Sequence, residues 1–112
     1  MKNMYNALNM LYSRAHKQMT ADELETLGSA FRDSAISIAQ DTSTVLEGIA
    51  CLILSENDAH EKGVQVSGSL QHPDSIFQTL CMAAAKFDLI AGMIEVGSEA
   101  KYHANERKEA AK

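Results

Sequence analysis

The sequence of 112 residues has no tryptophan, few aromatic residues (5%), a single proline and two cysteines. Hydrophobic residues still make up 46% of the chain, so its core must be built mainly from aliphatic side chains, alanine and methionine. Cys51 and Cys81 both lie in apolar runs, and we expect them to be buried, reduced thiols that act as small hydrophobic residues. The one proline, Pro73, fits the first turn of a helix, where its missing amide donor is not needed.

Positive charge is also scarce. The formal net charge is −5, and residues 18–61 hold nine acidic residues against Arg32 alone, whereas residues 1–17 hold three basic residues and no acidic one. A nucleic-acid surface needs a net basic face, so we expect no direct contact with nucleic acid. No signal peptide and no uninterrupted apolar span is visible, which by elimination predicts a cytoplasmic protein without a membrane contact.

Apolar residues at helical spacing predict three helices. The first covers residues 3–17. The second begins after a capping box at Thr20 and Glu23 and runs to about His60, because its apolar stripe from Leu24 to Leu52 never changes phase. Residues 41–44 are its weak point, since Asp, Thr and Ser side chains compete for backbone hydrogen bonds, and a kink or break there stays open.

The third helix is expected to begin at Pro73 and to continue to about Asn105. Residues 61–72 form a glycine-containing connection, so the second and third helices should make a long antiparallel hairpin, with the first helix against its open end. We therefore predict one all-α domain over residues 1–105 and a frayed tail over residues 106–112, which lacks an apolar stripe.

The third helix carries two apolar stripes. The first stripe consists of Ile76, Phe77, Leu80, Ala84, Phe87, Ala91, Ile94 and Ser98. The second stripe consists of Met82, Leu89, Met93 and Val96. A helix that is apolar on two sides requires two partners. The hairpin needs only one stripe, so we expect the second stripe to be a partner or dimer interface, with a homodimer completing a helical bundle; burial of this stripe by the first helix is the alternative.

The sequence offers little for catalysis or metal binding. Two Glu/His pairs have i, i+4 spacing (Glu56 with His60, Glu99 with His103), but a hairpin would place them at opposite ends. Residues 63–70 have only the outer glycines of a phosphate-binding loop, and Ser98 with Lys101 matches a Ser-x-x-Lys pattern without its companion motifs. We therefore expect no enzyme activity, no cofactor and no metal ion.

These observations favour a small, self-associating, non-enzymatic protein that acts by binding another protein, as a regulatory or accessory factor. Two alternatives remain. The acidic segment of residues 18–61 could be a decoy for a basic nucleic-acid groove, as in an inhibitor of a defence complex carried by a mobile element. A helical-bundle metal-binding protein is the other.

Overall fold

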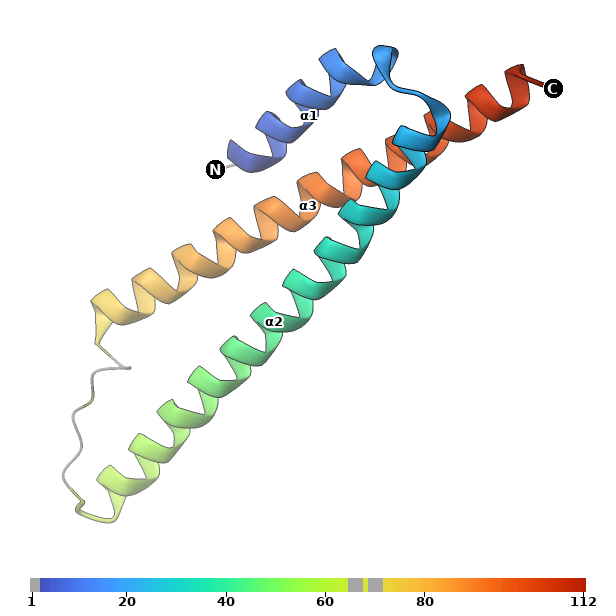
Figure 1. Ribbon diagram of the computed structural model, residues 1–112. Coiled ribbons are helices and arrows are strands. Elements are labelled where there is room, and N and C mark those ends of the chain that lie inside the picture. The colour runs from blue at the N-terminus through green and yellow to red at the C-terminus, as the bar shows by residue number, and fades with distance from the viewer. Residues whose placement is uncertain (1–2, 65–67, 69–71) are drawn as a thin grey trace.

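The structure is a computed structural model that describes residues 3–64, 68 and 72–112. It contains the α-helices α1 (Asn3–Ala15), α2 (Ala21–Glu61) and α3 (Pro73–Ala110), with a short 3-10 helix, η1 (His16–Gln18), after α1. No strand occurs in these residues, so the predicted all-α class is confirmed. Figure 1 shows α3 in the middle, with α1 along one part of it and α2 along another.

Helix α2 begins where the sequence predicts. The Thr20 hydroxyl accepts a hydrogen bond from the Glu23 amide at 3.1 Å, and the Glu23 carboxylate accepts one from the Thr20 amide at 2.9 Å. The helix then continues without a break through residues 41–44. The Thr44 hydroxyl donates to the carbonyl oxygen of Gln40, so this side chain bonds within the helix and does not end it.

Helix α3 also begins as predicted, with Pro73 in its first turn and the His72 ring accepting a hydrogen bond from the Asp74 amide. It ends later than predicted, at Ala110 instead of about Asn105. Arg107, in the segment expected to fray, donates a 2.6 Å hydrogen bond to the carbonyl oxygen of His16. This contact links the last turns of α3 to the end of α1.

The molecule is long and thin. Its Cα atoms extend over 73 × 22 × 12 Å, and their radius of gyration is 20.4 Å, whereas a compact domain of this length would have a radius of about 13 Å. The smallest extent is larger than the Cα diameter of one helix, about 4.6 Å, and slightly less than two packed layers of helices would give, about 13–15 Å. Domains normally need two packed layers around a core, and this chain does not complete the second.

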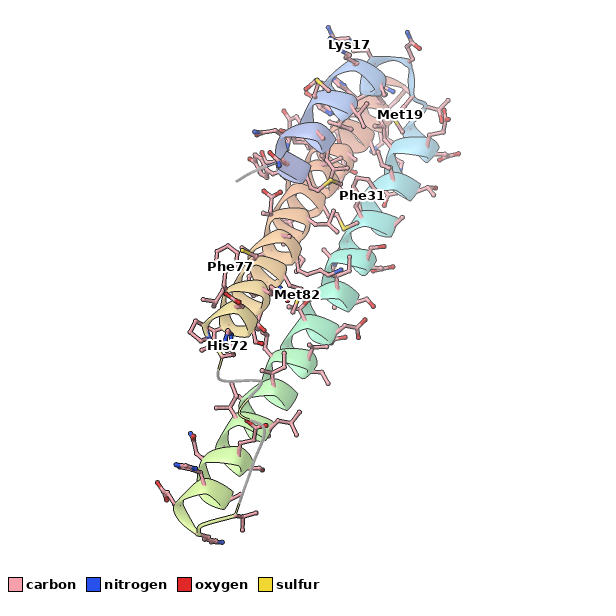
Figure 2. The ribbon with its side chains drawn as sticks, turned by 90° about the vertical axis from the view of Figure 1, so that its left-hand side faces the viewer. Lys17, Met19, Phe31, His72, Phe77 and Met82 are labelled. Carbon is pink, nitrogen blue, oxygen red and sulfur yellow. The ribbon has the colours of Figure 1, made fainter. Side chains whose placement is uncertain are left out.

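The core lies at the end of the molecule where α1, the start of α2 and the end of α3 meet. Its buried residues are Tyr12, Leu24, Val96, Ala100 and Ala104, against which Leu8, Met19, Leu27 and Phe31 pack. Figure 2 shows Phe31 on α2, on the side toward α3. In α2 no residue after Thr42 is buried, and in α3 none before Ala83. The part of α2 after Thr42 and the part of α3 before Ala83 therefore have no core of their own.

Small residues determine how closely the helices approach. A Cβ atom placed on Gly97 of α3 would lie 3.3 Å from the carbonyl oxygen of Gly28 of α2. Gly28 faces Gly97 and Glu25 pairs with Lys101, so the two helices run antiparallel. In this register, Pro73 is level with about Leu52, and α2 extends beyond the start of α3, as both views show.

Candidate interaction surface

Helix α1 is seated on α3 at a glycine. A Cβ atom on Gly92 would lie 2.9 Å from the Cα atom of Tyr5 and 3.0 Å from a methyl carbon of Leu8. Only a residue without a side chain therefore allows the two helices to approach this closely. The contact fixes where α1 crosses α3 and leaves the opposite side of α3 uncovered by α1.

Both ends of α1 are held by side chains of α3. At its start, the Asp88 carboxylate accepts hydrogen bonds from the amides of Met4 at 2.8 Å and Tyr5 at 3.3 Å. The first four amides of a helix generally lack an intrahelical acceptor, and a carboxylate also suits the positive end of the helix dipole. At the other end, Arg107 donates to the His16 carbonyl oxygen. Sequence reasoning missed both contacts, because residues about 85–90 positions apart give no local signal.

Three rings meet where α1 ends. The Tyr12 hydroxyl lies 2.6 Å from Nδ1 of His103, and the rings of His16 and His103 stack with centroids 4.5 Å apart and an interplanar angle of 7°. Nδ1 of His16 is buried and has no hydrogen-bond partner among the residues that the structure describes. Burial lowers the pKa of His16 from its ordinary value of 6.5, and the nearby charges of His103, Lys17 and Arg107 lower it further, against the opposing effect of Glu99.

Burial has the opposite effect on the pKa of the neighbouring tyrosine. It raises the pKa of Tyr12 above its ordinary value of 10.0, because burial disfavours the charged phenolate. The charge of Glu99 acts in the same direction, and Arg107 opposes it. Tyr12 therefore remains a neutral hydrogen-bonding residue, and the cluster joins α1 to α3 without offering an ionised nucleophile.

Helices α2 and α3 are joined by one polar cluster beside the Gly28–Gly97 contact. The Lys101 ammonium donates to the Glu25 carboxylate at 2.5 Å and to the Ser29 hydroxyl at 2.7 Å, and Lys108 lies 3.6 Å from the same carboxylate. The hydrogen bond from Lys101 lowers the pKa of Glu25. Because these side chains are partly exposed, the pairing contributes modestly to stability; its main effect is to fix the register of the two helices.

The first stripe of α3 is an apolar surface that the chain leaves exposed. Ile76, Phe77, Leu80, Phe87 and Ile94 keep between 44% and 67% of their area exposed, and Ala84, Ala91 and Ser98 are exposed as well. Figure 2 shows Phe77 on the side of α3 away from α2. We call Ile76, Leu80, Ala84, Phe87, Ala91 and Ile94 the α3 stripe.

The second stripe, predicted to be the partner or dimer interface, is the one that the chain itself covers. Val96 is in the core with 1% of its area exposed, and Met82, Leu89 and Met93 are half-buried. Within the single chain, the second stripe is therefore the more buried of the two, and its role as a partner or dimer interface stays a prediction. The faces of α3 that pack within the chain are rich in small residues (Ala83, Gly92, Gly97, Ala100, Ala104), whereas the bulky side chains of the α3 stripe would hold a neighbouring helix further away.

A groove of about 780 Å³ runs between α2 and α3. Its α2 wall consists of Gly28, Arg32, Ala35, Ile36 and Ala39, and its α3 wall of Ile90, Met93, Ile94, Gly97, Ser98 and Lys101. Ile94 belongs to both the groove and the α3 stripe, so the two form one continuous surface. Arg32 makes no hydrogen bond or ion pair within the described chain.

The other residues singled out in the sequence do not come together as a site. In the described parts of the chain, no three His, Cys, Asp or Glu side chains gather closely enough to hold a metal ion. Glu99 lies near His16 and His103, as its place in the sequence suggests, whereas Glu56 and His60 are far along α2. Cys51 is exposed and Cys81 is half-buried, which corrects the expectation that both thiols are buried.

Helix α2 is long and apolar enough to cross a membrane by length and composition alone. One 18-residue window in Ala21–Glu61 has a mean hydropathy of 1.2, and 6% of that window is buried within the chain. This is weak support for a membrane segment, because the core helix of a soluble protein can pass the same test. It does reinforce the observation that much apolar surface of α2 is uncovered.

No protein-family model, curated protein or solved structure matches the chain. The function is therefore inferred from the geometry described above.

Proposed function

We propose that the protein is a non-enzymatic, regulatory or accessory factor that acts by binding protein, and that it works as a homodimer. The observation that carries this proposal is the exposed α3 stripe, a row of large apolar side chains along one side of the central helix. Exposed apolar surface on this scale is typical of protein interaction sites. The proposal places the interaction on the α3 stripe instead of on Met82, Leu89, Met93 and Val96.

The part of α2 after Thr42 and the part of α3 before Ala83 give further support. They contain no buried residue, yet they hold the exposed large side chains Val45, Leu52, Leu54, Ile76, Phe77 and Leu80. Helices of this kind depend on tertiary packing for most of their stability in water. A bound protein provides that packing.

Sedimentation equilibrium of the full chain at micromolar concentration tests the self-association. We expect a mass of twice 12.2 kDa, with a thermal midpoint that rises with protein concentration, because dissociation accompanies unfolding. A monomer at these concentrations, with a midpoint independent of concentration, would contradict the proposal. The predicted cytoplasmic location remains a prediction, which fractionation of the native cell tests.

The acidic-decoy function is the second candidate, and one observation favours it. Of the nine acidic residues in residues 18–61, only Glu25 forms an ion pair in the part of the chain that the structure describes. The others form no ion pair within the described residues and lie along a 41-residue helix. Binding to a basic partner that weakens steeply with salt supports a decoy, and binding that is indifferent to salt contradicts it.

A further inference from the structure

We propose that a second copy of this chain docks on the continuous face formed by the α3 stripe and the α2–α3 groove. Two copies of α2 and α3 then build a four-helix core, with both α1 helices on the outside. This inference rests on the self-association proposed above, and it adds the surface, the arrangement and the residues.

The contact faces of α3 are arranged around its axis at angles that suit such a core. At 3.6 residues per turn, successive residues are separated by about 100° around a helix. On this measure the α3 stripe lies about 100° from the direction of Gly97, which faces α2. In a four-helix bundle each helix has two neighbours at about a right angle. Gly92, which seats α1, lies on a third side, so a partner on the stripe does not displace α1.

The exposed area is of the size that a stable dimer buries. The accessible surface is 7873 Å², whereas a compact monomer of 12.2 kDa would expose about 6,100 Å². The excess is about 1,800 Å², and permanent homodimers bury roughly 1,000–2,500 Å² on each chain. One partner of the same kind therefore accounts for the excess, and no larger assembly is required.

The chemistry of the groove favours a protein partner over a lipid surface. Its small residues Ala35 and Ala39 leave room for the side chains of a facing helix, and Ile36 and Ile94 form apolar edges. Arg32 also lines it without an ion pair in the described chain. A hydrocarbon layer would leave that guanidinium without a partner, whereas a second copy brings an acidic α2 helix that can pair with it.

The first test is the Ile94→Glu variant in sedimentation equilibrium, compared with Leu11→Glu. Both residues are aliphatic and more than half exposed, but Leu11 is on α1, away from the proposed face. We expect Ile94→Glu to weaken dimerisation at least 100-fold and Leu11→Glu to change it less than threefold. A wild-type monomer would overturn both the proposed function and this inference. A dimer that persists in Ile94→Glu would overturn only the docking face.

A second measurement does not depend on how the charged variant folds. In a Cys51→Ser background, Ala91→Cys places a thiol on the α3 stripe and Ser13→Cys places one on α1; both positions are exposed in the single chain. At a dimer-forming concentration, we expect a thiol reagent to modify Ala91→Cys at least tenfold more slowly than Ser13→Cys, and the difference should vanish on dilution. Equal rates at all concentrations would overturn the proposal.

A vesicle measurement distinguishes a second copy from a membrane. Flotation with vesicles of mixed zwitterionic and anionic lipid should leave the wild-type chain in solution. Protection of Ala91→Cys that requires vesicles, with no change on raising the protein concentration, would show that lipid covers the face and would overturn the proposal.

Discussion

Replacing Gly92 by alanine tests the docking of α1 most directly. The added methyl group would lie 2.9 Å from the Cα atom of Tyr5 and 3.0 Å from a Leu8 methyl carbon. The Leu8 side chain can rotate, but the Tyr5 atom belongs to the backbone. Helix α1 must therefore move away from α3 as a unit, which also lengthens the hydrogen bonds that hold its two ends.

The size of the effect follows from a comparison with Gly48→Ala. A Cβ atom at Gly48 meets nothing within 4 Å, so this variant should gain the usual helix preference of alanine over glycine, about 1 kcal/mol. Gly92→Ala receives the same gain but crowds a packed contact, which costs about 1–3 kcal/mol. The helix preference cancels in the comparison, so the free energies of unfolding of the two variants should differ by about 1–3 kcal/mol.

Urea unfolding followed by circular dichroism measures this difference, with all chains at the same protein concentration because a dimer's stability depends on it. Amide hydrogen exchange should also be faster throughout α1 in Gly92→Ala than in Gly48→Ala. If both variants are stabilised equally, and α1 keeps its protection, then α1 does not pack on Gly92 and the reasoning is refuted.

Three further outcomes are expected. Asp88→Ala removes the acceptor of two amides at the start of α1 and should lower the free energy of unfolding by about 1 kcal/mol, while Asp33→Ala, which breaks no hydrogen bond or ion pair within the described residues, should change it little. Thr20→Ala removes the cap of α2 and should cost about 0.5–2 kcal/mol in urea unfolding; Thr20→Ser should restore most of it. The third outcome concerns pH: because the folded pKa of His16 lies below 6.5, the unfolded chain binds the proton first. The stability that neutral His16 contributes should be fully present above about pH 6.5 and should be lost as pH falls toward the folded pKa. His16→Asn should flatten that part of the curve of unfolding free energy against pH, and an unchanged curve would contradict this assignment.

Local chemistry in the sequence predicted most of the secondary structure. The Thr20–Glu23 capping box set the start of α2, and the proline at position 73 marked the start of α3. The unbroken apolar phase of α2 correctly favoured a single helix over the weak segment at residues 41–44. Each of these features depends on residues within one or two turns, which is why the sequence shows them.

The candidate interaction surface could be predicted only in part. Periodicity detected both apolar stripes of α3 but did not show which of them the chain itself covers, because hydrophobic spacing shows that a face is apolar and not which neighbour it meets. A better signal was present in the small residues Gly92, Gly97, Ala100 and Ala104, which mark where helices can approach closely. Their positions could have indicated that these faces of α3 pack within the chain.

The sequence by itself determined that this protein is helical, where its helices begin, and that α3 has more apolar surface than one neighbour can cover. Only the tertiary structure decided which surface remains free. Close packing at Gly92 and Gly97 requires backbones in contact, and the bulky α3 stripe cannot provide that, so it was left exposed. Contacts between residues distant in the chain, such as Asp88 with the start of α1 and Glu25 with Lys101, hold α1 and α2 in these positions on α3.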